Sequence, residues 1–294
     1  MLYLLLGDVG SGKTTACLSA IEHAIGRGEN GYLLVPEQET VSAETVFADH
    51  MPPQAALHFE VTNFTRLANT AFRLYGGLSM HYATPAAKAL TMHKTMRELA
   101  PYLHQKSTHF DSGKILGHLD GLRALHFADI TSEDLSQAAK KTKDQHLKEK
   151  LEDLSLISAF YHDALTESYA DAEDDLEILC DLLYLHRCFA GKQFFFDSFH
   201  SFTAQQYRVL EAILPYSDVT ITLTLPAWAE ESICFGEILE TKSKLEKLAK
   251  KVGVSLKIQE LGENKRQKNT LLRHVCRHIW TSDYRHASPC APID

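Results

Sequence analysis

The stretch YLLLGDVGSGKTT, residues 3–15, decides the fold of this chain. Its second half matches the pattern GxxxxGK[ST], in which a glycine-rich backbone and a lysine surround a phosphate group. An apolar run leads into the glycines, the helical sequence TTACLSAIEHAIGRG leads out of them, and a second apolar run, GYLLVP, follows at 31–36. This order predicts a strand, a helix and a parallel strand, with a phosphate-binding loop after the first strand.

Each part of the loop has a predicted task. Backbone N–H groups of the glycine turn and of the helix start would surround the phosphates of ATP. Lys13 would reach the β- and γ-phosphates, and the hydroxyl of Thr14 would bind Mg²⁺. The predicted nucleotide-binding residues are Gly7, Asp8, Val9, Gly10, Ser11, Gly12, Lys13, Thr14 and Thr15.

Short runs rich in β-branched and aromatic residues predict six strands in all. They are YLLLG (3–7), GYLLVP (31–36), HFEVTNF (58–64), QFFFDSF (193–199), DVTITLTL (218–225) and VSLKIQEL (254–261). Between about 80 and 190, apolar residues recur every three to four positions instead, which is typical of amphipathic helices. We therefore expect an α/β fold of the P-loop NTPase type, a parallel sheet with helices on both faces and a large all-helical insertion. The expected boundaries are 1–80 and 190–294 for the P-loop domain and 81–189 for the insertion.

Composition narrows the cellular setting. The chain has 294 residues and six cysteines without a CxxC pair, which favours reduced thiols in the cytoplasm. We expect no membrane partner, because no apolar run approaches the 18 or so residues of a transmembrane helix. Residues 129–181 carry 15 acidic and 5 basic residues, whereas 241–278 carry 11 basic and 3 acidic ones. A basic stretch of this kind can follow phosphates or simply form a solvated helix face.

A P-loop ATPase also needs a carboxylate at the end of a buried strand to hold Mg²⁺. Asp197, after the run FFF, is placed for that role. Many ATPases follow this aspartate with a glutamate that orients the attacking water, but here the next residue is Ser198, a poor base. We therefore expect ATP binding with little hydrolysis, and we assign no catalytic residue.

These segments together carry a family resemblance. FDSFHSFTAQQ resembles motif II of superfamily 1 helicases with serine in place of glutamate, LVPEQ falls at their motif Ia, and VTNFTRLA resembles the motif after it. With GDVGSGKT, they resemble the N-terminal part of the AddB family, the B subunits of bacterial helicase–nucleases. The motif III position, ITLTLPA, departs from the helicase pattern because its acidic and glutamine residues are missing.

The resemblance implies a degenerate motor that binds ATP and single-stranded DNA in double-strand break repair and homologous recombination. It implies an AddA partner subunit, recognition of the Chi hotspot sequence, and a nuclease domain and iron–sulfur cluster beyond residue 294. The cysteines of this chain are then not that cluster's ligands. Carried over by position, the DNA-binding candidates are Gln38, Thr40, Phe64, Arg66, Phe199 and Phe202. Aromatic rings stack on bases, while arginine and amides contact phosphates or base edges.

Two other interpretations stay open at this point. The chain could be an active P-loop ATPase or a small-molecule kinase, with the helical insertion as a lid and Glu37 as a base. It could also be a purely structural domain whose glycine loop no longer binds a ligand. A rate of ATP turnover would separate this enzyme from the binding module. HVCRH at 274–278 has metal-ligand residue types, but it lacks the glutamate of HExxH and an obvious third ligand, so we expect ordinary histidines there.

Overall fold

The computed structural model describes residues 1–76, 81–104, 112–171, 174–229, 233–262, 265, 266, 269 and 275. The HVCRH segment lies almost entirely outside this described part of the chain. The chain divides into two compact units. The first, here called the sheet unit, is formed by residues 1–67, 182–202 and 209–294, and the second, the helical unit, by residues 68–181 and 203–208.

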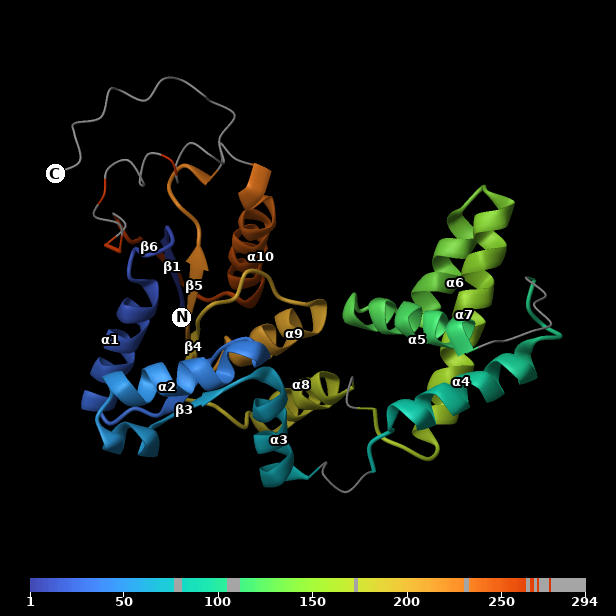
Figure 1. Ribbon diagram of the computed structural model, residues 1–294, viewed down its shortest axis with the longest axis horizontal. Helices are drawn as coiled ribbons and strands as arrows, with labels where there is room; N and C mark the ends of the chain where they lie inside the picture. The colour runs from blue at the N-terminus through green and yellow to red at the C-terminus, as the bar shows by residue number, and fades with distance from the viewer. Residues whose placement is uncertain are drawn as a thin grey trace. The chain divides into compact units, whose positions relative to one another are not determined.

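The sheet unit contains six parallel strands in the order β3-β2-β4-β5-β1-β6 (Figure 1). Their bounds are β1 (Leu2–Gly7), β2 (Gly31–Leu34), β3 (Phe59–Thr62), β4 (Gln193–Phe196), β5 (Asp218–Thr224) and β6 (Leu256–Glu260). All six predicted strands are confirmed: β1 begins one residue earlier than predicted, and the other five are shorter by one to three residues. The predicted fold class, an α/β fold with a parallel sheet, is also confirmed.

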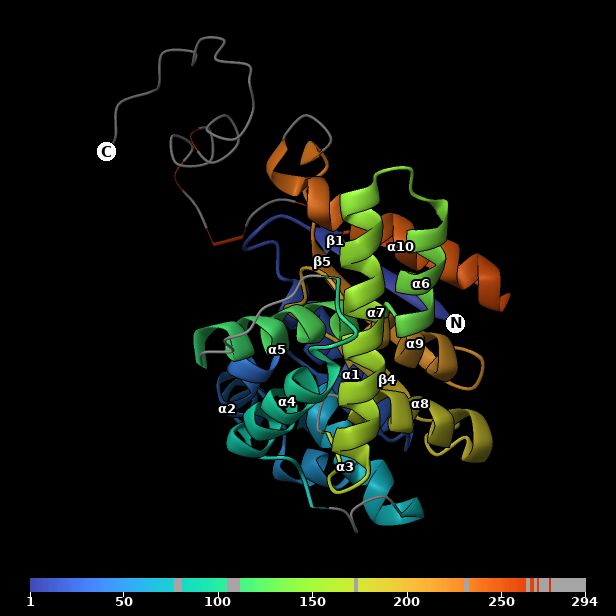
Figure 2. The same cartoon turned by 90° about the vertical axis from the view of Figure 1, so that its right-hand side faces the viewer.

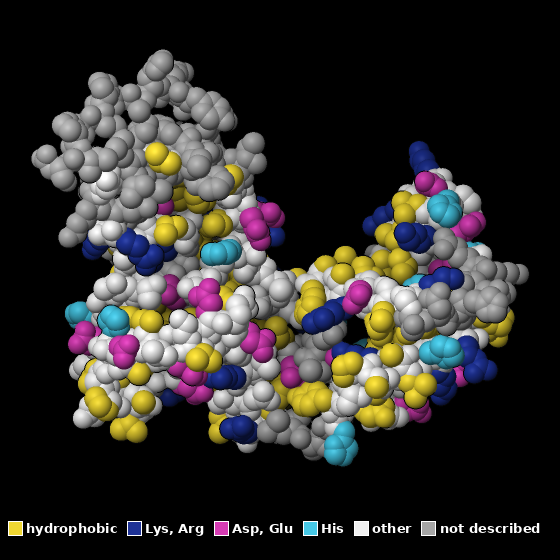
Figure 3. Space-filling model, viewed as in Figure 1, with side chains coloured by type: hydrophobic (Ala, Val, Ile, Leu, Met, Phe, Trp, Pro, Cys, Tyr) yellow, Lys and Arg dark blue, Asp and Glu magenta, His cyan; other side chains and the backbone are white. Residues whose placement is uncertain are grey.

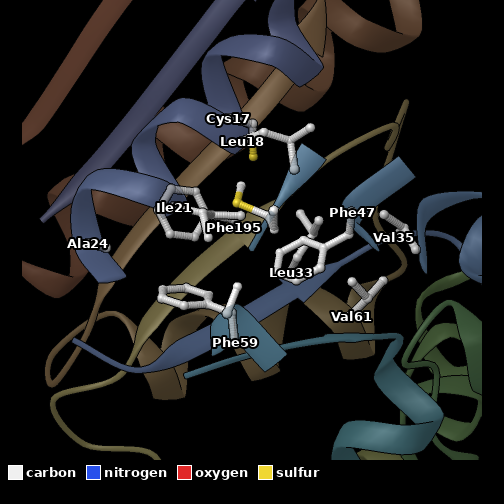
Figure 4. Close-up of a cluster of buried hydrophobic side chains, with 12 residues drawn as sticks. Cys17, Leu18, Ile21, Ala24, Leu33, Val35, Phe47, Phe59, Val61 and Phe195 are labelled. Carbon is white, nitrogen blue, oxygen red and sulfur yellow. The ribbon is translucent and has the colours of Figure 1, made fainter. Parts of the chain in front are cut away.

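One face of the sheet is covered by α1 (Lys13–Gly26) and α2 (Thr40–His50). Successive residues of a strand point to opposite faces, so Leu33 and Phe195 join this layer while their chain neighbours do not. Figure 4 shows their side chains packed with those of α1, including Ile21, and with Phe47 of α2. The predicted helix after the glycine loop is therefore α1, and its apolar stripe anchors the loop to the sheet.

The other face of the sheet carries the alternate residues. Phe194 and Phe196 of β4 are fully buried there. Figure 1 shows α10 (Gly236–Val252) on the other side of the strands from α1, and α10 buries Leu245 and Ala249. Helices α3 (Phe64–Tyr75), α8 (Asp175–His186) and α9 (Ala204–Ile213) each have residues in both units. Short 3-10 turns complete the described elements as η1 (Glu37–Glu39), η2 (Pro53–Leu57) and η4 (Ile233–Phe235).

The helical unit is built from α4 (Pro85–Leu99), α5 (Ser112–Phe127), α6 (Ser132–Lys141) and α7 (Gln145–Thr166). Figure 2 shows α6 and α7 side by side, and the two helices pack against each other. Thr84 caps α4 by accepting a hydrogen bond from the backbone N–H of Ala87, and Thr131 with Asp134 forms a capping box on α6. Threonine is a common residue directly before a helix, because its hydroxyl can accept a hydrogen bond from the first turn.

A separate apolar core holds the helical unit together. It joins Met92 and Met96 of α4 to Ile115 of α5 and to Ile157 and Leu165 of α7. Other large apolar side chains stay on the surface, and Figure 3 shows hydrophobic side chains interspersed with lysines and arginines. Among the described helices, none has both the length and the apolar character needed to cross a membrane.

Candidate nucleotide-binding site

The glycine loop between β1 and α1 has the backbone that its sequence requires. Gly10 and Gly12 adopt φ values of 79° and 91°, a left-handed region that residues with a Cβ rarely enter. Gly7 needs to be glycine for a different reason. A methyl group built on it would overlap the hydroxyl of Ser11. The loop buries Gly7 and Ser11, half-buries Asp8, Gly10, Gly12 and Lys13, and exposes Val9, Thr14 and Thr15.

Lys13 lies across this loop. Its Nζ atom donates hydrogen bonds to the carbonyl oxygens of Gly7 at 3.2 Å and Asp8 at 2.8 Å. Partial burial lowers the pKa of Lys13, while the carboxylates of Asp197 and Asp8 raise it and the nearby charge of Arg266 lowers it. The ammonium is therefore held at the start of α1, where the helix dipole also favours an anion.

Asp197 is brought to the loop from two strands away. It follows β4, and β5 lies between β4 and β1. The hydroxyl of Thr14 donates to Asp197 Oδ2 at 2.8 Å, and the hydroxyl of Thr222 in β5 donates to Oδ1. Asp197 is only 5% exposed, so these hydroxyls supply the donors that a buried carboxylate needs.

Oxygen atoms of Thr14 and Asp197 have the chemistry that Mg²⁺ prefers. They lie close enough to bind one ion directly or through its waters, because the two atoms already share a hydrogen bond. This geometry suits a Mg²⁺ ion presented with nucleotide phosphates. Thr222 was not among the residues predicted from sequence, and the only signal for it was its place on a buried strand that follows the aspartate in the chain.

Ser198 continues from Asp197 in an unusual backbone conformation. Its φ is 65°, the left-handed region that costs a residue with a Cβ about 1–2 kcal/mol. Serine carries a hydroxyl in place of the carboxylate of glutamate, and a neutral hydroxyl is a poor acceptor for a proton from water. The buried carboxylate of Asp197 is thus followed by a residue that cannot act as the usual base.

Three of the six DNA-binding candidates are aromatic rings that pack against each other. The exposed fractions of Phe64, Phe199 and Phe202 are 6%, 6% and 7%. The rings of Phe199 and Phe202 stack with centroids 4.9 Å apart, and Phe64 and Phe196 contact both of them. A ring that stacks on a base needs a solvent-exposed face. In this structure the three rings are buried and form an apolar cluster with Phe196.

The other three candidates follow β2 and β3, whose carboxyl ends lie at the same edge as the glycine loop. Gln38 is exposed in η1, but Thr40 is buried and its hydroxyl donates to the carbonyl oxygen of Glu37 at 2.9 Å. Arg66 is 49% exposed and forms a 2.6 Å ion pair with Glu44. Gln38 and Arg66 are thus the candidates whose side chains reach the surface.

Asn63 is a further residue that sequence reasoning did not single out. Its side-chain oxygen accepts a hydrogen bond from the backbone N–H of Arg66, and its amide donates to the hydroxyl of Thr40 at 3.3 Å. It therefore begins α3 and ties the segment after β3 to the segment after β2. An asparagine directly before a helix is a recognised start signal, so the sequence did contain the clue.

A parallel sheet, a glycine loop with two left-handed residues, and a strand-end aspartate bound to the loop threonine define a P-loop-like α/β protein. Comparison with known families makes this more specific. Residues 4–275 match the family model described as "ADDB, N-terminal". The chain belongs to this family.

Several curated relatives are similar over most of the chain, and each is named as the B subunit of an ATP-dependent helicase/deoxyribonuclease. Those from Caldanaerobacter subterraneus subsp. tengcongensis and Thermoanaerobacter sp. (strain X514) are 33% and 30% identical over 260 and 294 residues. These alignments cover 86% and 96% of this chain but 22% and 25% of the relatives. The homologue from Clostridium novyi is 28% identical over 258 residues, which cover 86% of this chain and 23% of the relative. The chain thus spans about a quarter of the length of these curated relatives.

Proposed function

We propose that this chain is a nucleotide-binding, degenerate motor domain from the B subunit of a helicase–nuclease that acts in DNA double-strand break repair and homologous recombination. The observation that carries the proposal is the group formed by Lys13, Thr14 and Asp197, with Ser198 in the place of the usual base. The family membership and the printed names of the relatives support the setting in a helicase and deoxyribonuclease. ATP and Mg²⁺ are the ligands, and the cytoplasm is the compartment.

In this proposal, residues 1–80 and 190–294 form motor domain 1A, and residues 81–189 form its 1B insertion. Single-stranded DNA and an AddA-type subunit are the partners, and Chi recognition belongs to the assembled complex. Gln38 and Arg66 are the surface residues that support a strand-binding role at the sheet edge. Thr40, Phe64, Phe199 and Phe202 support that edge from the interior.

The direct test is ATP binding by calorimetry in the presence of Mg²⁺. We expect Lys13→Ala to remove binding, because the variant loses the cation held at the start of α1. The melting temperature should change little, since the hydrogen bonds of Lys13 within the described structure go to two loop carbonyls and its side chain adds nothing to the apolar core. Equal ATP affinity in the variant and the original chain would contradict the proposal.

Turnover separates this proposal from the active-enzyme alternative. We expect ATP hydrolysis far below 1 s⁻¹, with or without single-stranded DNA, because no positioned base follows Asp197. Turnover at or above about 1 s⁻¹, in the range of ordinary enzymes, would favour an active ATPase or kinase instead. In that case Glu37, exposed in η1, would be the first residue to replace.

A further inference from the structure

The helical unit contains two adjoining cavities, with volumes of about 370 and 310 Å³. They share a wall formed by residues of α5, of α7 and of the turn before α8, namely Leu122, His126, Ser158, His162 and Asp174. All of these residues belong to the helical unit. Cavities of this size between packed helices are common places for a ligand or for a partner's side chains.

The lining combines apolar side chains with carboxylates. Leu119 lines the larger cavity, and Leu125 and Ile130 line the smaller one, where Ile130 is 39% exposed. The described lining of the smaller cavity includes no lysine or arginine but four acidic residues, which are Asp129, Asp163, Asp174 and Glu177. This combination suits a ligand that is both cationic and partly apolar.

Two of the four carboxylates already have a cationic partner. Arg208 in α9 forms ion pairs with Asp129 at 3.2 Å and with Glu177 at 3.6 Å. Within the described part of the chain, no lysine or arginine pairs with the side chain of Asp163 or Asp174. The negative charge that remains uncompensated therefore lies on these two residues.

Asp174 differs in this respect from the other aspartates beside it. The carboxylate of Asp171 accepts a hydrogen bond from Lys88 Nζ at 2.7 Å, and that of Asp175 accepts one from the hydroxyl of Tyr82 at 3.1 Å. Among the described residues, no side chain or backbone group donates a hydrogen bond to the carboxylate of Asp174. Asp174 is thus a carboxylate in a cavity wall that can still accept a donor.

The histidine beside Asp174 does not fill this role. Nε2 of His126 lies 3.6 Å from Oδ1 of Asp174, which is longer than a hydrogen bond, but only 2.6 Å from the amide nitrogen of Gln205. When that amide donates to it, Nε2 carries no proton and the imidazole is neutral. Burial raises the pKa of the Asp174 carboxyl. A further cation in the cavity would offset this cost of burial.

We propose that the two cavities form a docking site for a basic segment of a partner protein, with an arginine or lysine side chain of the segment bound to Asp174 and Asp163. The aliphatic stem of such a side chain would lie against the leucines while its charged end meets the carboxylates. Because the cavities adjoin, one extended segment can place successive side chains in both. The inference goes beyond the nucleotide-binding role and does not depend on it.

Charge and ligand chemistry favour this occupant. Residues 129–181 carry 15 acidic and 5 basic residues, so a basic segment would be attracted before it docks. A metal ion is a poorer fit, because no three histidine, cysteine, aspartate or glutamate side chains of the described residues are grouped to hold one.

The test uses a short synthetic peptide of alternating arginine and leucine with a fluorescent label, and measures its binding to the whole chain by fluorescence anisotropy. We expect Asp174→Asn to weaken binding by at least about tenfold, because charge-assisted hydrogen bonds are the stronger kind. Asp163→Asn, at an exposed position of the same lining, should also weaken binding. This second variant keeps the test decisive if the Asp174 variant has a lower melting temperature.

The matched control is Glu133→Gln on α6. It removes one negative charge from an exposed position of the same unit that lines neither cavity, and it should bind the peptide as the original chain does. A peptide with glutamate in place of arginine should not bind.

Three results would overturn the inference. The first is an original chain that does not bind the arginine peptide. The second is an affinity that the two aspartate variants leave unchanged, or that the Glu133 control lowers equally. The third is spermine binding as tightly as the peptide, because the cavities would then be a site for small polyamines and not for a protein segment.

Discussion

Asp197 and its two threonine partners show how the site depends on individual hydroxyl groups. Asp197 is buried, and its two carboxylate oxygens accept hydrogen bonds from Thr14 and Thr222. Thr14 comes from the loop and Thr222 from the strand between β4 and β1. The two hydroxyls fix the orientation of the carboxylate beside the loop, where we propose that Mg²⁺ binds.

Replacement of Thr222 by valine keeps the shape of the side chain but removes the donor. We expect Thr222→Val to lower the free energy of unfolding by about 1–3 kcal/mol, because the buried carboxylate loses a partner. The Mg²⁺ concentration needed for half-maximal ATP binding should rise as well. Thr222→Ser, which keeps the hydroxyl, is the control in chemical denaturation, and equal stability of the two variants would argue against this role.

At the scale of elements, the parallel strands meet closely at Gly31. A methyl group built on this first residue of β2 would overlap the carbonyl oxygen of Gln193 in β4 and lie 2.7 Å from the ring of Phe59 in β3. A backbone atom of a central strand cannot move aside without breaking the ladder. Strands β2 and β4 can therefore pair in this register only if position 31 has no side chain.

Replacement of this glycine tests the register of the sheet. We expect Gly31→Ala to destabilise the chain by about 3 kcal/mol or more, at the upper end of overpacking effects. Gly121→Ala in α5 is the matched control, because a methyl group there meets no atom within 4 Å. The control should raise stability by up to about 1 kcal/mol, since alanine is the better helix former. Thermal denaturation of both variants measures the difference, and similar melting temperatures would contradict the explanation.

At the scale of the whole molecule, burial separates the cysteines into two buried thiols, Cys17 and Cys180, and an exposed one, Cys234. Cys17 of α1 is fully buried, and burial followed by the charge of Asp197 raises the pKa of its thiol well above the ordinary value. Burial raises the pKa of Cys180 in α8 to about 12. Cys234, in contrast, is exposed. A raised pKa means that less thiolate is present at a given pH, and only the thiolate reacts quickly with alkylating agents.

Alkylation therefore reports on the packing of the folded chain. At pH 8, we expect iodoacetamide to modify Cys17 and Cys180 at least about a hundredfold more slowly than Cys234. The labelling rates of the two buried thiols should still be rising above pH 9, because their thiols ionise only at higher pH. Peptide mapping by mass spectrometry separates the sites, and denaturant should make the rates similar. Rapid modification of Cys17 in the folded chain would contradict its burial between α1 and the sheet.

Much of the fold could be predicted from local patterns. The apolar runs of the strands and the helical spacing of apolar residues are properties of short segments, so the six strands and the helical insertion followed from them. The predicted stacking residues could not be judged in this way. Phe64, Phe199 and Phe202 are close in type to rings that bind bases, but whether a ring is open or buried depends on which segments pack over it.

By itself, the sequence determined the parallel α/β class, the glycine loop with Lys13 and Thr14, the strand-end Asp197 and the resemblance to the AddB family. These features depend on residues that are near each other in the chain or on motifs with a known order. Only the tertiary structure decided that Thr222 completes the bonding of Asp197, that Phe64 lies in an aromatic cluster, and that Lys265 is bonded to the loop at Gly10. These contacts join segments that are distant in sequence, and their formation depends on the order of strands in the sheet, which no local pattern encodes.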